Sequence, residues 1–175
     1  MEAATGAKLD PAFIADWSQR YLDAWNAGDA AAIAAMCSED VSWSDPGLPE
    51  GAHGRNGVRR FVEETFRAFP DFRVEEVAAP LLSESEPLAL APYRMTGTMR
   101  GPWEPLGLAA TGARIEVRGV DEWRFRDGLM CRYATYYDSL DMARQLGVLP
   151  AAGSGAERLM ARLQPLQARF QRRRR

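Results

Sequence analysis

Two carboxylates, Asp121 and Asp138, lie in a segment whose sequence predicts a half-buried β-hairpin. The dipeptide Asp127-Gly128 predicts the turn, because a two-residue type I′ turn needs a positive φ at both central positions. If Arg126 and Leu129 close this turn, both carboxylates fall on one mostly apolar face of the hairpin. Ionised groups on such a face cost free energy unless they are paired or take part in chemistry.

The same register assigns the other residues of the hairpin to faces. The face that carries the carboxylates also holds an arginine, a tyrosine and a glycine that leaves space for a ligand. The opposed pairs on it are Trp123 with Arg132, Asp121 with Ala134, Gly119 with Tyr136, and Val117 with Asp138.

Asp138 is the candidate acid–base residue. A carboxylate in an apolar pocket has a raised pKa, which suits it to act as a general base near neutral pH. Tyr136 flanks Asp138, and Val117 and Gly119 lie opposite in the predicted register. The alternative is structural, since aspartate is a preferred N-cap and a helix is predicted to start near Ser139.

Asp121 has a structural alternative as well. It lies diagonally across from Arg132 in the predicted register, and a buried ion pair would explain both residues without catalysis. The two aspartates are separated by roughly 13 Å along the strand, so they would line different parts of one cavity and not share a proton. Both readings stay open at this point.

Further candidates for substrate contact come from other predicted elements. The loop 101–105 is placed to cover a cavity mouth. For the apolar candidates, core packing is the alternative reading. The predicted cavity walls are Tyr21, Trp43, Met95 and Trp103. The single histidine, His53, is predicted to be a loop residue, and no histidine cluster indicates a metal site.

The elements that must position these residues are helices first and strands later. Asp10-Pro11 predicts a helix to about Asn26, because Asp is a good N-cap and Pro suits the first helical position. Aromatic residues recur every four positions along it, which indicates a core-facing stripe. We expect a second helix from Asp29 to about Cys37, a short strand at 41–46, a glycine-rich loop at 47–57, and a third helix that ends at Pro70.

The second half of the chain predicts strands in hairpin order. Strands are expected at 72–82, 88–100, 112–126 and 129–138, followed by a short helix at 139–146, a linker at 150–155 and a tail helix at 156–170 interrupted near Pro165. Helices followed by paired strands predict an α+β fold, a cone-shaped half-barrel in which N-terminal helices and a curved antiparallel sheet enclose a cavity.

Composition bounds the class of protein. With 175 residues, 46% of them hydrophobic and 26% charged, the chain suits one globular domain, predicted at 10–150 between a disordered segment 1–9 and a linker and tail at 151–175. No apolar run is long enough for a membrane span and no signal peptide is evident, so we expect a cytoplasmic protein with its two cysteines reduced. Residues 158–175 hold seven arginines and no acidic residue, and we expect a solvated tail that does not bind nucleic acid.

Six segments together resemble the SnoaL-like polyketide cyclases, within the superfamily of nuclear transport factor 2 and ketosteroid isomerase. They cover roughly residues 13–150, and each is weak alone whereas the series is fairly specific. The segments are Trp25-Asn26-Ala27-Gly28-Asp29, Trp43-Ser44-Asp45-Pro46, Phe69-Pro70-Asp71-Phe72, Thr96-Gly97-Thr98, Arg124-Phe125-Arg126-Asp127-Gly128, and Asp138 with Gln145-Leu146-Gly147.

The resemblance implies a cone-shaped barrel, often dimeric through its sheet, that closes a polyketide ring by aldol chemistry in natural-product biosynthesis without metal or organic cofactor. The family's acid–base aspartate matches Asp138, whereas Asp121 and Met99 stand where the family often has histidine. The superfamily's epoxide hydrolases use an Asp-Arg-Asp set, for which Arg132 or Arg94 would have to supply the guanidinium. A non-catalytic ligand-binding or dimerisation module is the third alternative.

Overall fold

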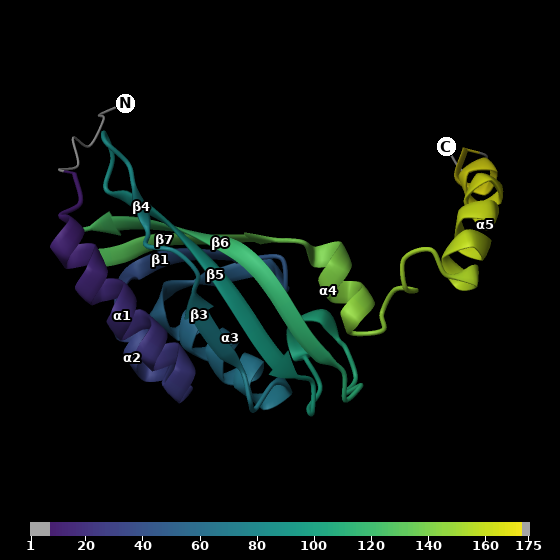
Figure 1. The fold of residues 1–175 in the computed structure, drawn as a ribbon, viewed down its shortest axis with the longest axis horizontal. Helices are drawn as coiled ribbons and strands as arrows, with labels where there is room; N and C mark the ends of the chain where they lie inside the picture. The colour runs from purple at the N-terminus through teal and green to yellow at the C-terminus, as the bar shows by residue number, and fades with distance from the viewer. Residues whose placement is uncertain (1–7, 173–175) are drawn as a thin grey trace.

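The structure is a computed structural model and describes residues 8–172. Three helices and two strands come first, and the longest strands follow (Figure 1). In chain order the elements are α1 (Pro11–Ala27), α2 (Ala30–Ala35), β1 (Cys37–Asp45), β2 (Leu48–His53), α3 (Gly54–Ala68), β3 (Arg73–Glu76), β4 (Leu81–Leu82), β5 (Leu88–Thr98), the 3₁₀ helix η1 (Glu104–Leu106), β6 (Arg114–Arg126), β7 (Leu129–Tyr137), α4 (Ser139–Gln145) and α5 (Gly155–Arg172).

The strands form one curved, unclosed sheet. Its order is β2-β1-β7-β6-β5-β3, with β4 also paired to β5. All neighbours are antiparallel except β1 and β7, which run parallel. Helices α1, α2 and α3 cover one face of the sheet, and α4 lies at the end of β7 (Figure 1). The predicted α+β half-barrel is therefore confirmed, with one parallel pair in a sheet predicted to be antiparallel.

Local signals account for the boundaries of α1. The side chain of Asp10 accepts a hydrogen bond from the Ala12 N–H at 3.1 Å, and Pro11 occupies the first turn. Gly28 ends the helix with a φ of 69°, which glycine adopts without strain. The aromatic stripe faces the sheet, where the Trp17 ring stacks on Tyr21 and meets Trp123 with centroids 4.9 Å apart. The predicted start, end and core-facing stripe of this helix are confirmed.

The segment predicted as a glycine-rich loop, 47–57, was assigned wrongly. It contains the edge strand β2 and the first turn of α3, and β1 begins at Cys37 where a helix end was expected. The Gly47 N–H donates to the Asp45 carboxylate at 2.7 Å, which closes the tight turn between β1 and β2. The strand was missed because Leu48–His53 has no alternation of apolar and polar residues, the usual signal of a strand.

The register of the β6–β7 hairpin differs from the prediction after the first two pairs. Arg126 pairs with Leu129 as expected, but a β-bulge between Arg124 and Phe125 shifts every later pair by one residue. A one-residue slip moves each side chain of β7 beyond the bulge to the opposite face. Asp121 therefore lies opposite Thr135, and Gly119 opposite Tyr137.

The C-terminal segment lies beside the domain and not within it. Helix α5 extends beyond α4 (Figure 1) and continues through Pro165, where an interruption was predicted. Disorder was predicted for residues 1–9, and residues 1–7 of this segment lie outside the described residues. Among the helices described, none has both the length and the apolar character to cross a membrane.

Candidate active-site cavity

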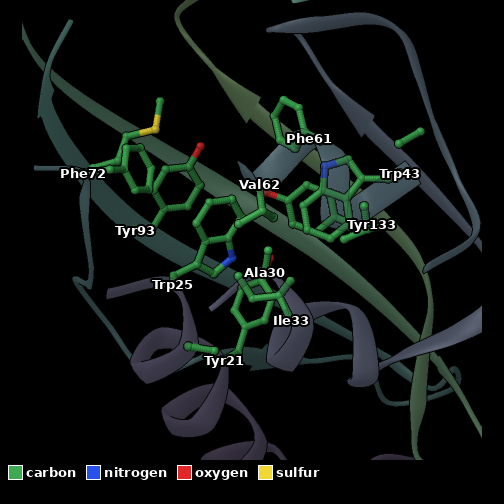
Figure 2. Packing of buried hydrophobic residues seen from close by; sticks show 14 of the residues in the cluster. Tyr21, Trp25, Ala30, Ile33, Trp43, Phe61, Val62, Phe72, Tyr93 and Tyr133 are labelled. Atoms are coloured by element: carbon green, nitrogen blue, oxygen red, sulfur yellow. The ribbon is translucent and has the colours of Figure 1, made fainter. Parts of the chain in front are cut away.

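A small cavity of about 60 Å³ lies between the helices and the inner face of the sheet. Three carboxyl groups reach it, those of Asp45, Glu76 and Asp121. Most of the remaining wall is aromatic, and Figure 2 shows several of these rings packed together in the core. The aromatic residues that line the cavity are Tyr21, Trp25, Phe61, Phe69, Phe72, Tyr93, Trp103, Trp123, Tyr133 and Tyr137.

Asp121 is a buried carboxyl group on the inner face of β6, with only 6% of the residue exposed. The Tyr133 hydroxyl donates a hydrogen bond to it at 2.8 Å. Burial raises the pKa of Asp121 to about 7, and the hydroxyls of Thr135 and Tyr133 offset that rise only in part. Around neutral pH this group therefore holds a proton in a large share of molecules, so it can donate a hydrogen bond as well as accept one.

Asp45 is the second carboxylate of the cavity and stands at the end of β1. It accepts hydrogen bonds from the Gly47 N–H at 2.7 Å and the Tyr137 hydroxyl at 3.0 Å. Burial raises the pKa of Asp45, and both donors act against that rise because they stabilise the ionised form. The charge of Asp45 is in turn one cause of the raised pKa of Asp121, so the two carboxyl groups are coupled.

A phenol without a hydrogen-bond partner completes the polar part of the cavity. The Tyr21 hydroxyl is buried and has no partner among the described residues. Burial, followed by the charge of Asp121, raises the pKa of Tyr21 well above its usual value. A buried hydroxyl that is left unpaired costs free energy, and a ligand oxygen would satisfy it.

Tyr93 and Thr135 form a supporting pair next to Asp121. Their hydroxyls are 2.7 Å apart. Gly119, the direct cross-strand neighbour of Tyr93, makes room for that phenol, because a Cβ at Gly119 would lie 2.5 Å from the Tyr93 hydroxyl oxygen. The space that the sequence indicated beside Gly119 is thus filled by Tyr93.

Four of the predicted polar site residues lie outside the cavity, and the shifted register explains three of them. Asp138 is exposed, and its side chain accepts from the Asp141 N–H at 2.9 Å as the N-cap of α4. Arg132 is exposed on the outer face, so the predicted pairing with Asp121 is wrong. Tyr136 is 58% exposed there as well. Arg94, also on the outer face, forms ion pairs with Glu75 and Glu116.

The apolar predictions fit the cavity better. Tyr21, Met95 and Trp103 line it. Trp43 lies one layer behind, where its ring stacks on Tyr133 with centroids 3.7 Å apart (Figure 2). His53 precedes α3 and makes no side-chain cap there. In the part of the chain that the structure describes, no three His, Cys, Asp or Glu side chains gather as metal ligands would.

Sequence reasoning missed Asp45, Tyr93, Tyr133 and Tyr137. For Asp45 a signal was available, because Val41, Trp43 and Asp45 are spaced two apart along β1 and the first two are large hydrophobic residues, which places the carboxylate on the inward side. The tyrosines of β7 were assigned to the wrong face, since the bulge that reverses their orientation has no marker in the sequence.

Comparison with known proteins identifies the family. Residues 18–133 match the model of the SnoaL-like domain, so the chain belongs to this family, as the resemblance predicted. TsrD from Streptomyces laurentii is 25% identical over 81% of this chain and 99% of its own, with a TM-score of 0.69.

Two further structures share the fold. A candidate polyketide cyclase from a Silicibacter species is 24% identical, with a TM-score of 0.61, over 75% of this chain and 93% of its own. A protein from Catenulispora acidiphila with a ketosteroid isomerase-like fold, solved with trimethylamine, is 15% identical, with a TM-score of 0.63, over 78% and 95%. No curated protein matches the chain.

Proposed function

We propose that the cavity catalyses cofactor-free proton transfer beside a carbonyl group of a hydrophobic, polyketide-type small molecule, as a cyclase or isomerase of natural-product biosynthesis. One observation carries the proposal. A carboxylate held by two donors, Asp45, and a carboxyl group whose pKa burial raises to about 7, Asp121, line the same mainly apolar cavity. Two carboxyl groups with different tendencies to ionise divide the roles of base and acid.

Asp45 is the proposed base. Its two hydrogen bonds favour the ionised form, while burial keeps its basicity above that of an exposed carboxylate. Asp121 in its neutral form and the unpaired Tyr21 hydroxyl would both donate hydrogen bonds to the oxygen of the enolate. Ketosteroid isomerase works by the same division, with one aspartate as base and another kept protonated by an apolar site.

Two reactions follow from the same first step. Asp45 removes a proton from the carbon beside the carbonyl, and the electron pair moves to form an enolate. In an aldol closure the enolate carbon attacks a second carbonyl of the molecule, and the alkoxide formed takes the proton back. In an isomerisation the proton returns to another carbon. Neither reaction changes the oxidation state of the substrate, so no redox partner enters.

The two alternatives, an epoxide hydrolase and a non-catalytic binding module, have less support than the proposed acid–base enzyme. An epoxide hydrolase with an Asp-Arg-Asp set needs a guanidinium in the cavity, and no arginine is among its described lining residues. A binding module without catalysis would use the same cavity, so only a measurement of turnover separates it from the proposed enzyme.

Deuterium exchange in D₂O tests the proposal without knowledge of the natural substrate. Hydrophobic ketones such as 2-tetralone are incubated with the protein, and loss of the proton signals beside the carbonyl is followed by NMR. Asp45→Asn should slow exchange by about 10²–10⁴-fold, the usual contribution of a general base. Asp138→Asn is the matched control, because this carboxylate is exposed and outside the cavity.

Two outcomes would contradict the proposal. Exchange by Asp45→Asn at the wild-type rate would exclude Asp45 as the base. Binding of the ketones by the wild-type protein, measured by calorimetry, without any exchange would favour the non-catalytic module. Circular dichroism of each variant establishes that the fold is retained.

A further inference from the structure

A second chamber of about 260 Å³ lies directly outside the cavity, between the β1–β2 turn, the η1 loop and α4. Its wall is mainly apolar, and two of its side chains are well exposed, Val148 at 49% and Leu106 at 38%. The apolar residues that line the outer chamber and not the inner cavity are Pro46, Leu106, Leu108, Ala143, Leu146 and Val148.

Three side chains separate the two spaces, because Trp103, Tyr137 and Met142 line both of them. The Tyr137 hydroxyl donates to Asp45 at 3.0 Å, so the proposed base stands at this boundary. A reacting carbon beside Asp45 would therefore have the inner cavity on one side and the outer chamber on the other.

Trp103 forms the part of the boundary next to the base. A Cβ built on Gly47 would lie 2.4 Å from Cη2 of Trp103 and 3.1 Å from Oδ1 of Asp45, so the indole edge rests on the bare backbone of Gly47 beside the carboxylate. The ring of Phe69 meets Trp103 edge-on, with centroids 5.5 Å apart. The Trp103 indole N–H is buried without a hydrogen-bond partner among the described residues. The backbone of Trp103 is held by its hydrogen bonds with Leu108, whereas the indole is positioned by packing.

Volume shows that the inner cavity is incomplete as a substrate site. Ligand pockets usually measure about 300–1,000 Å³. The inner cavity, at about 60 Å³, has room for a carbonyl group and the carbons beside it, whereas the rest of a hydrophobic substrate needs space elsewhere. The adjoining apolar chamber borders the inner site, because Trp103, Tyr137 and Met142 line both.

We propose that the outer chamber is a second subsite, which holds the apolar remainder of the substrate, and that Trp103 sets specificity as the wall between the subsites. The substrate class is then a ketone with its reactive carbonyl at one end and an apolar chain or ring at the other. This inference rests on the proposed function for the identity of the reactive end, but the chamber itself is testable by binding alone.

Calorimetric binding of alkan-2-ones, from butan-2-one to decan-2-one, measures the subsite directly. Once the alkyl chain of the ketone is long enough to extend past Asp45, each further methylene should tighten binding by roughly four-fold. This factor corresponds to about 0.8 kcal/mol per buried methylene. Ala143→Phe places a ring in the outer chamber and should abolish this dependence on chain length. Leu140→Phe is the matched control, because Leu140 is on the same helix, is 50% exposed and lies outside the chamber.

Gly47→Ala tests Trp103 without changing the tryptophan. The new methyl group would displace the indole, while the backbone N–H that donates to Asp45 remains. Long ketones should bind several-fold more tightly to this variant and butan-2-one should not. Trp103→Leu should act in the same direction, and it keeps the test decisive if Gly47→Ala does not fold.

The outcomes separate this inference from the proposed function. Affinity that rises with chain length and is lost in Ala143→Phe supports the subsite even if no variant exchanges deuterium. Affinity that is independent of chain length, or that keeps its dependence in Ala143→Phe, overturns the subsite even if Asp45 proves to be the base.

Discussion

At the scale of single residues, the protonation of Asp121 determines what the cavity can do. Its carboxyl group is buried, accepts one short hydrogen bond from Tyr133 and is close enough to Asp45 for their charges to interact. The neutral form is consequently favoured up to about pH 7. Asp45 is buried as well, and both carboxyl groups have donors that favour the ionised form, so burial alone does not decide which carboxylate is the acid and which the base.

The rate of ketone exchange should show a bell-shaped dependence on pH. The rate rises as Asp45 ionises and falls above about pH 7, where Asp121 loses the proton that it would donate to the enolate. Asp121→Asn keeps a neutral donor, so its decline at alkaline pH should disappear while its maximal rate is reduced. NMR exchange rates between pH 4 and 9 check this. If the exchange rate of Asp121→Asn still falls at alkaline pH, a group other than Asp121 causes the fall.

The stability of the protein should depend on pH through the same residue. Between the ordinary value of 3.8 and about 7, the folded state keeps the Asp121 proton and the unfolded state does not. Rising pH therefore favours unfolding, by at most about 1.4 kcal/mol per pH unit for one group. Asp121→Asn removes this dependence and should be more stable than wild type at pH 8. Urea unfolding at pH 4 and pH 8 measures the difference, and an equal slope in both proteins would contradict the raised pKa.

Asp138 should contribute to stability and not to the reaction. Because it caps α4, Asp138→Ala should cost about 1 kcal/mol of unfolding free energy, whereas Asp138→Asn, another good cap, should cost little. Chemical unfolding together with deuterium exchange checks both effects. Loss of exchange in folded Asp138→Asn would restore the catalytic role that the family resemblance implies.

At the scale of elements, the bulge in the β6–β7 hairpin decides which side chains enter the cavity. It turns Tyr133, Thr135 and Tyr137 inward and Arg132 and Tyr136 outward. Without the bulge, Asp121 would lie on the same face as Arg132, diagonally across the hairpin, where the two could form an ion pair. The local shift in register thus converts a structural pair into a candidate catalytic group.

Elements with local signals were predictable from the sequence, whereas those that depend on pairing were not. The start of α1 follows from Asp10-Pro11, its end from Gly28, and the β6–β7 turn from Asp127-Gly128. The bulge, the edge strand β2 and the parallel pairing of β1 with β7 arise from contacts between distant segments. Asp121 was found because a lone acid on an apolar strand is conspicuous, and Tyr133 was missed because its face depends on the bulge.

Gly119 should prove necessary for the packing of β5 against β6. An added methyl group would lie 2.5 Å from the Tyr93 hydroxyl oxygen and 2.8 Å from the carbonyl oxygen of Tyr136. Gly119→Ala should therefore cost about 1–3 kcal/mol through overpacking. Gly155→Ala is the control, since nothing lies within 4 Å of the added group. Urea unfolding measures both, and equal stability of the two variants would show that Tyr93 moves away freely.

At the scale of the whole molecule, charge divides the chain into two parts. Residues 1–157 carry 24 acidic and 15 basic residues, whereas residues 158–175 carry seven arginines and no acid. The outer face of the sheet holds paired charges, such as Arg94 between Glu75 and Glu116. Association of two copies through this face stays a prediction, which light scattering of the purified protein would test.

Removal of residues 154–175 should leave the domain intact. Helix α5 is tied to it by the ion pair of Arg144 with Glu157 at 2.6 Å, and the large apolar side chains Leu159, Met160 and Leu163 are about half exposed. Surface interactions of this kind change the free energy of unfolding by no more than about 0.5 kcal/mol. For a chain of this size, that corresponds to a change in Tm below about 2 °C. Thermal unfolding of the truncated and full-length proteins, with deuterium exchange as a second readout, checks this. A larger fall in Tm that depends on protein concentration would instead show that α5 packs against a second copy of the chain.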